Sequence, residues 1–377
     1  MHFLRAERTV VAELLPGLDE ALAALPLAVL ERPGNPALAL FRQHGGPGLL
    51  IPAEHGGRGA TALQAVRVQR ALGSRSPSLA IATTMHHFSV ATLVEMSVGA
   101  SSSGFEWLVL EGIARQRLYV ASGFAEGRPD TSILSSGIEV RRTEGGLVLS
   151  GSKKPCSLSQ SMDLLTASIR LPTEDGRPGE LAVVIIPAAT PGIERRPFWN
   201  SPALAGAESE EIVLREVHVP DNLIAHAAGQ KDWDHVQERS FLWFELLITA
   251  SYLGAASALV ERVLTTGRGT PCERALPAIE VEAAMAAVEG VARAIMAGER
   301  GPDLLARALF VRFAVQSAVE RAAACAAELL GGMAFVTAPD VALLLASVRA
   351  LAFHPPSRGS ISPALDCHLN GGTLRVE

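Results

Sequence analysis

Apolar residues follow two different spacings along the chain. In the middle, short alternating or continuous apolar runs occupy residues 146–150, 181–186 and 212–214, and Gly, Pro and charged turns separate them. This pattern predicts β-strands. On the C-terminal side, apolar residues recur three or four positions apart, as in residues 281–297 and 306–330, which predicts helices. The N-terminal part has the same helical character, so the predicted order is helical, β, helical.

This order divides the chain into three blocks. We expect an N-terminal helical domain at residues 1–117, a central β domain at 118–222 and a C-terminal helical bundle at 223–377. Gly- and Pro-containing turns interrupt the helical blocks at residues 51–59 and 265–271. No internal repeat and no low-complexity linker separates the blocks, so we expect them to pack as one unit.

Composition excludes several classes of protein. The chain has 377 residues, of which 48% are hydrophobic and 19% charged, as in a globular protein with a large core. A net charge of −6 with acids and bases interspersed argues against nucleic-acid binding. No uninterrupted apolar run reaches about 18 residues, so a membrane span is not expected. The first eight residues lack the apolar run of a signal peptide.

The cysteines give no sign of a metal or disulfide site. Cys156, Cys272, Cys325 and Cys367 lie far apart and form no CxxC pair. We interpret them as reduced thiols of a cytoplasmic protein, and we expect no metal site.

Several short motifs are informative as a series. A Gly-rich turn (PAEHGGRG, residues 52–59) precedes a predicted helix and lacks the Lys-Ser/Thr of a phosphate-binding loop. Glu126 stands 25 residues before the GSK turn at 151–153, and Asp163 follows Gly151 by twelve residues. The phrases EVHVP (216–220) and GGMAF (331–335) come later. Together these motifs resemble, in the same order, those of the acyl-CoA dehydrogenase superfamily, over residues 45–355.

The resemblance implies a fold and a cofactor. The fold is of the α+β class, acyl-CoA dehydrogenase-like, with an N-terminal helical domain, a central β barrel and a C-terminal four-helix bundle. FAD would lie between the β domain and the C-terminal helices. A homodimer or homotetramer is expected, because the family builds its cofactor site across a subunit interface.

The family's flavin-binding positions are occupied here by Phe124-Ala125-Glu126 and Pro155-Cys156-Ser157. An isoalloxazine ring needs donors near N1, O2 and N5, and backbone groups can supply them whatever the side chain. Ser157 keeps a hydroxyl, whereas Ala125 does not, and Pro155 replaces the aromatic ring that usually covers the flavin face. We therefore predict flavin contacts from Phe124, Ala125, Glu126, Pro155 and Ser157.

The resemblance also places residues at the far end of the cofactor. Arg268 stands where the family has the arginine of a turn that reaches the flavin of a neighbouring subunit, but the family's Phe-Gly and Gln are missing. Gly331 and Gly332 match a turn near the adenine half. Alternatively, Arg268 is a solvated loop charge and the glycines are a plain helix-terminating turn.

The usual base of a dehydrogenase is missing. His354 stands where many family members have the glutamate that abstracts the α-proton of a thioester. Glu245 lies within one residue of an alternative position for that base, inside the apolar run 241–250, where burial would raise its pKa. Alternatively, Glu245 faces an arginine or solvent.

A change of reaction is the other way to explain the missing base. Flavin-dependent monooxygenases with this fold often lack the glutamate and carry a late histidine that acts on a substrate hydroxyl or amine. His354 would fill that role, because its ordinary pKa suits proton transfer near neutrality. His87 and Trp243 are predicted substrate contacts; of the neighbours His86 and His87 only one can face the cavity.

Three functional hypotheses follow. The first is a dehydrogenase of an acyl thioester, free or carrier-bound, with Glu245 as base and an electron-carrier protein as partner. The second is a monooxygenase that uses O₂ and reduced FMN or FAD supplied by a flavin reductase, with His354 as acid/base. The third is an inactive binding subunit that retains the fold.

Overall fold

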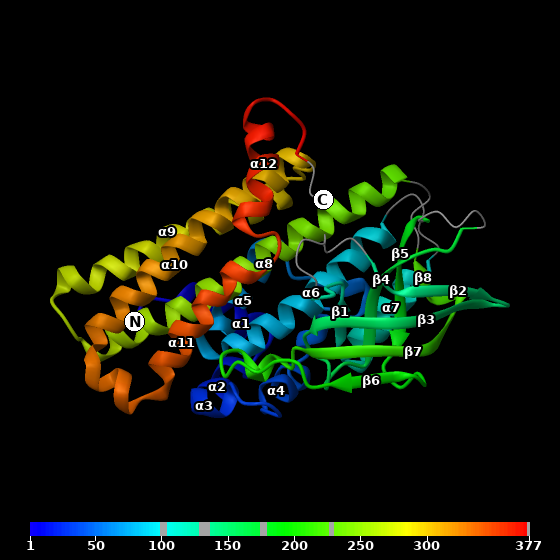
Figure 1. Ribbon diagram of the computed structural model, residues 1–377. Helices are drawn as coiled ribbons and strands as arrows, with labels where there is room; N and C mark the ends of the chain where they lie inside the picture. The colour runs from blue at the N-terminus through cyan, green and yellow to red at the C-terminus, as the bar shows by residue number, and fades with distance from the viewer. Residues whose placement is uncertain (99–103, 128–135, 174–178, 226–229, 375–377) are drawn as a thin grey trace.

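The computed structural model describes residues 1–377 except 99–103, 128–135, 174–178, 226–229 and 375–377, and only the backbone of residues 230–234. It has the predicted order of helices, strands and helices. Figure 1 shows long helices occupying one side of the molecule and the strands gathered at the other. The predicted α+β class is confirmed.

The N-terminal block is helical as expected. Its helices are α1 (Arg5–Leu14), α2 (Leu18–Ala23), α3 (Leu27–Leu30), α4 (Ala37–Gln43), α5 (Ala62–Arg75), α6 (Pro77–Ser97) and α7 (Phe105–Gln116). The Gly-rich turn ends where Thr61 begins α5 with a capping box, in which the Gln64 N–H donates to the Thr61 hydroxyl and the Thr61 N–H donates to the Gln64 side chain. Helix α6 is buried along nearly its whole length, and it passes beneath the cavity described below.

The described strands form two four-stranded sheets. The first has the order β1 (Val120–Gly123), β4 (Leu164–Arg170), β5 (Leu181–Pro187) and β8 (Ile224–Ala225), with β1 parallel to β4 and the other pairs antiparallel. The second is antiparallel, with the order β2 (Glu139–Thr143), β3 (Gly146–Cys156), β7 (Glu210–Pro220) and β6 (Ile193–Arg196). All three sequence runs predicted to be strands lie inside β3, β5 and β7. The first sheet extends to Ala225, three residues beyond the expected end of the β block.

The C-terminal block is built from long helices. These are α8 (Gln230–Thr266), α9 (Pro271–Met296), α10 (Pro302–Thr337), α11 (Pro339–Arg349) and α12 (Arg358–Leu369). Helices α8 to α11 pack against one another, as the predicted four-helix bundle requires. The predicted turn between α8 and α9 is present, and Thr270 with Glu273 forms a capping box at the start of α9.

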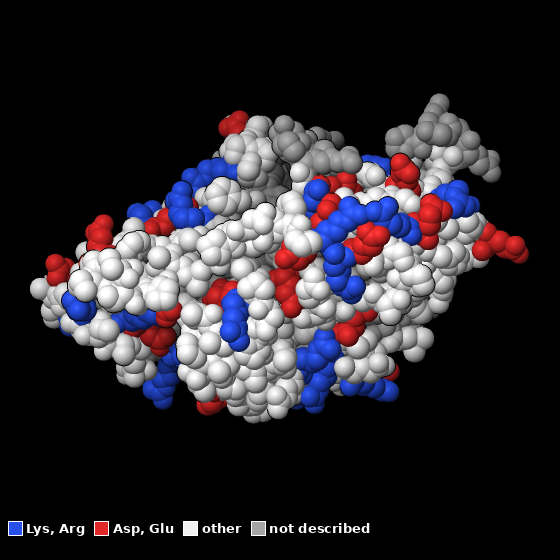
Figure 2. All heavy atoms as spheres, turned by 60° about the horizontal axis from the view of Figure 1, so that its bottom comes forward, with Lys and Arg blue, Asp and Glu red and all other residues white. Residues whose placement is uncertain are grey.

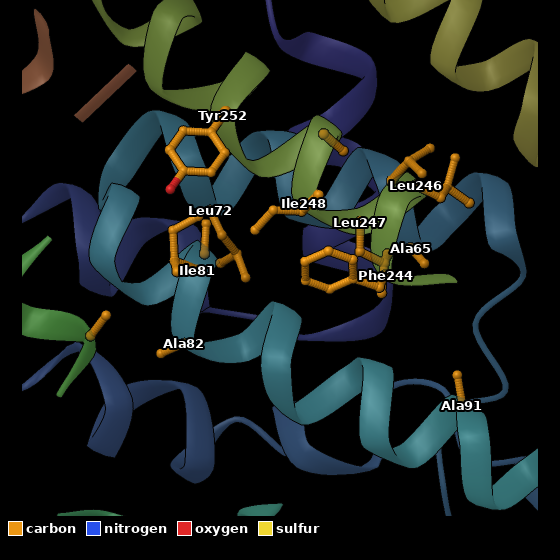
Figure 3. Packing of buried hydrophobic residues seen from close by; sticks show 14 of the residues in the cluster. Ala65, Leu72, Ile81, Ala82, Ala91, Phe244, Leu246, Leu247, Ile248 and Tyr252 are labelled. Carbon is orange, nitrogen blue, oxygen red and sulfur yellow. The ribbon is translucent and has the colours of Figure 1, made fainter. Parts of the chain in front are cut away.

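Helix α8 is the central element of this half. It crosses α5 at Gly73 and Gly254, where a Cβ on either residue would lie within 2.3 Å of a backbone oxygen of the other helix. Only glycine allows this approach, so the crossing fixes α8 against the N-terminal block. Figure 3 shows side chains of α8, among them Phe244 and Tyr252, packed with Leu72 of α5 and Ile81 of α6.

Helix α8 also carries the one described stretch that is apolar and long enough to cross a bilayer, residues 235–266. Its most apolar window is 94% buried inside the fold. The helix is therefore core in this molecule.

Charged side chains on the surface are mixed. On the side of the molecule that holds the sheets, Figure 2 shows basic and acidic atoms next to one another. Ion pairs such as Arg141–Glu216 and Arg142–Asp221 lie on β2, β7 and the turn after β7. Acidic and basic side chains therefore offset one another on this part of the surface.

Candidate active site

A cavity of about 350 Å³ lies where the three blocks meet. Its wall comes from α6, from the ends of β1 and β3, from β4 and β5, from the segment between β6 and β7, from α8, and from residues 350–355 after α11. The described lining residues are Ile81, Met85, Phe88, Thr92, Ser122, Phe124, Ala125, Pro155, Ser157, Ser168, Leu181, Val183, Trp199, Leu204, Ser209, Val236, Gln237, Ser240, Phe241, Phe244, Tyr252, Ala350, Phe353, His354 and Pro355.

The sheet side of the cavity is lined by small and hydroxyl-bearing residues. Phe124 and Ala125 follow directly after β1, and Pro155 and Ser157 lie at the end of β3. The Ser157 hydroxyl lies 2.9 Å from the Ser209 hydroxyl. Four of the five residues predicted to contact a flavin on this side therefore line the cavity.

The helical side is aromatic. Phe241, Phe244 and Tyr252 lie on one face of α8, because positions three and eleven residues apart return to nearly the same direction on a helix. The Phe244 ring makes an edge contact with Phe88 of α6 at a centroid distance of 5.8 Å, and Phe88 makes another with Phe124 at 5.4 Å. These rings form an apolar wall.

His354 and Tyr252 form a hydrogen-bonded pair in this wall. The His354 Nε2 atom lies 2.7 Å from the Tyr252 hydroxyl oxygen, and no described residue bonds to Nδ1. Burial, assisted by the nearby Arg312 guanidinium, lowers the pKa of His354 to about 3. Burial also raises the pKa of Tyr252. The imidazole is therefore neutral and the phenol protonated near pH 7.

The charge content of the lining is the most informative property of the cavity. Among its described lining residues there is no Asp, Glu, Lys or Arg, and His354 and Tyr252 are the only titratable groups. Any acid–base chemistry in the described part of the cavity thus falls to this pair.

Glu126, the fifth predicted flavin contact on the sheet side, turns away from the cavity. Its carboxylate accepts a hydrogen bond from Lys153 Nζ at 2.7 Å and from the Gly137 N–H at 2.8 Å. Both side chains of the ion pair are buried. Glu126 therefore anchors the loop after β1, which carries Phe124 and Ala125.

Glu245 is buried but does not line the cavity. Its carboxylate Oε2 lies 3.1 Å from Arg312 Nε, and both side chains are at most 1% exposed. Burial raises the pKa of Glu245 to about 8, against the opposing effect of Arg312. The predicted rise in pKa is present, but the carboxylate faces α10, so it has no contact with the cavity where a thioester would have to lie.

The two predicted substrate contacts also lie outside the cavity lining. His87 is fully buried, with its ring 5.8 Å from Phe41, and neither of its ring nitrogens has a hydrogen-bond partner among the described residues. His86 accepts a hydrogen bond from the Val120 N–H on Nδ1, which leaves Nε2 to donate to the Pro47 carbonyl. Trp243 is half-buried and packs on the core beside the cavity-facing Phe244. Neither side chain is among the described lining residues, so their contact with a substrate stays a prediction.

The residues predicted for the far end of the cofactor lie on the outside of the chain. Arg268 is exposed in the turn between α8 and α9, which Figure 1 places at the end of the molecule opposite the sheets. Gly331 interrupts α10 with φ of 84°, and the helix resumes after it. Gly332 is exposed. Their contact with a flavin of a neighbouring subunit stays a prediction.

Tyr252 and Trp199 are two of the lining residues that the sequence analysis did not name. Tyr252 is one of only two tyrosines in the chain, and that rarity inside an apolar helix was an available signal. Trp199, between β6 and β7, supplies an aromatic ring to the cavity wall, although Pro155 occupies the position where the family resemblance places one. Its indole N–H donates to the Ala203 carbonyl at 2.9 Å. No spacing pattern in the sequence connects Trp199 with Pro155.

The residues present fit a flavin ring. Hydroxyls of Ser122, Ser157, Ser168 and Ser209 on the sheet side suit its polar edge. The aromatic rings of the helical side suit its faces. The cavity volume lies at the low end of the range for small-molecule pockets, which leaves room beside the ring for a small substrate only.

Comparison with known proteins gives the family. No family model matches the chain. The chain is 47% identical to isobutylamine N-hydroxylase of Streptomyces viridifaciens over 379 residues, covering 100% of both chains.

Solved structures agree on the fold. FMN-bound TdsC of Paenibacillus sp. A11-2, a dibenzothiophene monooxygenase, superposes with a TM-score of 0.86 at 17% identity, covering 99% of each chain. The nitrososynthase of Micromonospora carbonacea var. africana gives 0.81 at 21% identity, covering 98% of this chain and 99% of its own. The expectation of a flavin cofactor agrees with these neighbours. The chain belongs to the same family as isobutylamine N-hydroxylase, and it has the acyl-CoA dehydrogenase-like fold.

Proposed function

We propose that the chain is a flavin-dependent monooxygenase that hydroxylates the nitrogen of a small aliphatic primary amine, using reduced flavin and O₂. The observation that carries this proposal is the absence of any carboxylate among the described lining residues, where His354 and Tyr252 are the only titratable groups. A thioester dehydrogenase requires a carboxylate at the α-carbon of its substrate. The identity with isobutylamine N-hydroxylase supports the same conclusion.

The first sequence hypothesis, a dehydrogenase with Glu245 as base, is not supported, because Glu245 does not line the cavity. Glu245 is directed at Arg312, and the cavity-facing residue of that helical turn is its neighbour Phe244. The hypothesis of an inactive binding subunit is also less well supported, because the cavity retains a hydrogen-bonded acid–base pair.

The substrate class follows from the cavity wall. Phe88, Phe241, Phe244 and Met85 offer apolar surface and no ionic partner. A short alkyl group gains from burial there by about 0.8 kcal/mol per methylene. A charged or strongly polar substituent would be left without a partner.

The same wall favours an uncharged amine. An alkylammonium ion that enters this cavity loses its hydration free energy, and no carboxylate in the described lining compensates for the loss. The amine would therefore bind in its neutral form. The neutral nitrogen keeps the lone pair that attacks oxygen. The missing carboxylate thus helps this reaction.

When bound, reduced flavin would supply the two electrons for the reaction: one atom of O₂ becomes the hydroxylamine oxygen and the other is reduced to water. The hydroxyls of Ser157, Ser168 and Ser209 would hold the polar edge of the ring. His354, which is neutral because its pKa is lowered to about 3, would accept a hydrogen bond from the amine N–H on Nδ1 and so orient the nitrogen lone pair. Its Nε2–H would then donate to the Tyr252 oxygen, which fixes the tautomer and the direction of the ring.

Reduced flavin has to be delivered by another protein. No described residue of the chain forms a nicotinamide-binding motif of the GxGxxG type. We therefore propose a flavin reductase as the partner.

The proposal is tested by assaying the purified chain with a flavin reductase, NADH, FMN or FAD, air and isobutylamine, with the hydroxylamine detected by mass spectrometry. We expect hydroxylamine only when the flavin is reduced, and highest specificity constants for short branched amines in a series that extends to hexylamine and benzylamine. A parallel arm mixes the chain with oxidised FAD and acyl thioesters. Flavin bleaching by a thioester, without any hydroxylamine from the amines, would show that the dehydrogenase hypothesis is the right one.

A further inference from the structure

Arg312 is a fully buried arginine on α10 whose side chain reaches the segment that carries His354. Nη1 donates to the Pro356 carbonyl at 2.6 Å, and Nη2 donates to the carbonyls of His354 at 2.6 Å and Leu351 at 3.2 Å. One guanidinium thus binds three backbone oxygens within six residues.

These three oxygens belong to a segment with few donors of its own. Pro355 and Pro356 carry no N–H, and the residue before a proline is held in an extended conformation, as His354 is with φ of −73° and ψ of 138°. Such a segment continues neither a helix nor a strand. A buried carbonyl without a donor is costly, so an outside donor such as the planar fork of an arginine stabilises the segment.

The fourth contact of Arg312 ties the cluster to α8. Nε lies 3.1 Å from Glu245 Oε2. Glu245 precedes Tyr252 by seven residues, which is two helical turns, so both side chains leave α8 on the same side. Arg312 therefore connects the backbone of His354 with the helix that carries the hydrogen-bond partner of His354.

We propose that Arg312 is a positioning residue, which fixes the His354 imidazole against the Tyr252 hydroxyl by holding the carbonyls of residues 351, 354 and 356, with Glu245 as its acidic partner. The effect of Arg312 on catalysis rests on the proposed function, whereas its effect on the position of the His354 ring does not. The competing explanation is that Arg312 and Glu245 are a core ion pair that stabilises the bundle and does nothing for the site.

Variants of both residues separate the two explanations. Arg312→Met alone leaves a buried acid without its partner and is expected to lower the melting temperature. Glu245→Leu with Arg312→Met replaces the pair by apolar side chains, which commonly restores stability. Arg312→Lys keeps the charge beside Glu245, but an ammonium group cannot reproduce the fork. Arg262→Met is the matched control. Arg262 of α8 pairs with Asp340 of α11, and none of its hydrogen bonds or ion pairs in the described part of the chain involves residues 351–356.

The first readout is turnover. For the double variant we expect a melting temperature above that of Arg312→Met but below that of the wild type, because the three carbonyls have lost their donor. Its kcat for hydroxylamine formation should be about a hundredfold lower, the usual effect of a displacement of about 1 Å. The KM for the amine should change less than threefold, and the missing turnover should appear as hydrogen peroxide. Arg312→Lys should show the same changes with a smaller loss of kcat. Arg262→Met should convert the same fraction of consumed O₂ into hydroxylamine as the wild type. A stable double variant with wild-type coupling would overturn the proposal.

The second readout needs no turnover. In ¹⁵N-labelled protein, the His354 ring signals are identified as those missing from His354→Gln. We expect one fixed neutral tautomer in the wild type and averaged tautomers in Arg312→Lys and in the double variant. Unchanged ring signals in both would contradict the proposal, even if the double variant is unstable. If the wild type forms no hydroxylamine, the proposed function fails, and this spectrum still decides on the role of Arg312.

Discussion

The two sides of the cavity are each supported by a buried ion pair, and the pairs are built in opposite ways. On the sheet side the carboxylate is the centre: Glu126 binds Lys153 at 2.7 Å and two atoms of the loop before β2. On the helical side the cation is the centre, since Arg312 binds three carbonyls, while neither oxygen of Glu245 accepts a hydrogen bond from any described residue.

This difference separates two carboxylates that look alike in the sequence. The family resemblance suggests Glu126 as a flavin contact and Glu245 as a catalytic base, and both side chains are buried. Neither lines the cavity. A perturbed pKa in an apolar run, as at Glu245, is therefore insufficient evidence for a catalytic base unless the side chain also has access to the ligand. On the proposed function, the helical side would orient the amine and the sheet side would hold the flavin.

The largest expected effect contrasts one residue from each side. His354→Ala should lower kcat for hydroxylamine formation about a hundredfold, because the amine loses the acceptor that orients it, with little change in the Kd of the flavin. Ser157→Ala should instead raise the flavin Kd about fivefold, as expected for one hydrogen bond, with little change in kcat. Stopped-flow kinetics and flavin titration measure the two constants. If both variants changed the same constant, the assignment of catalysis to the helical side and flavin binding to the sheet side would be contradicted.

The next effect concerns the carboxyl groups of the two buried pairs, Glu126 and Glu245. Glu126→Gln leaves Lys153 buried without its anionic partner and should cost about 3–5 kcal/mol in the free energy of unfolding. Glu245→Gln should cost about 1 kcal/mol or less near pH 6.5, because Arg312 keeps its three carbonyls and the carboxyl is already protonated there. Urea denaturation of both variants gives the comparison. Equal losses would mean that the two pairs are equivalent.

A pH dependence sharpens the comparison. The pKa of Glu245 rises from an ordinary 4.5 to about 8 on folding, so the native state binds this proton more tightly and stability falls as the pH rises between these values. His354, with a pKa lowered to about 3, acts in the opposite direction and only below about pH 6.5. Between pH 6.5 and 8, the wild type should therefore lose about 2 kcal/mol relative to Glu245→Gln. Parallel stability curves for the two proteins in this window would exclude the raised pKa.

The smallest effect concerns substrate size. The Phe244 ring contacts both Phe88 and His354 in the cavity wall, and Phe244→Leu replaces this ring by a smaller side chain. Amines one or two methylenes longer than the preferred substrate should gain up to about tenfold in kcat/KM, the usual value of one methylene in a hydrophobic pocket. Trp243→Leu on the same helix is the control, since Trp243 does not line the cavity. The cavity assignment would be wrong if only the control altered the preference.

The sequence predicted the fold well because its signals are local. The strands at 146–150, 181–186 and 212–214 and the long helices are visible in the spacing of apolar residues. The sheet side of the site was also predictable, because Phe124, Ala125, Pro155 and Ser157 belong to motifs that occur in a fixed order.

The helical side was not predictable in the same way. Tyr252 and His354 are 102 residues apart and meet only in the folded chain, and Arg312 is 42 residues from His354. Glu245 and Tyr252 leave α8 on the same side, so helical spacing alone does not show that Tyr252 lines the cavity while Glu245 contacts Arg312. The sequence therefore could not exclude Glu245 as the base of a dehydrogenase.

The most direct test of the central claim, that the cavity of His354 and Tyr252 hydroxylates an amine with O₂, is turnover of isobutylamine under ¹⁸O₂ with enzymatically reduced flavin. The account predicts one ¹⁸O atom in each hydroxylamine formed by the wild type, and loss of that product with release of peroxide in His354→Ala. Unlabelled product, or undiminished labelled product in His354→Ala, would contradict it.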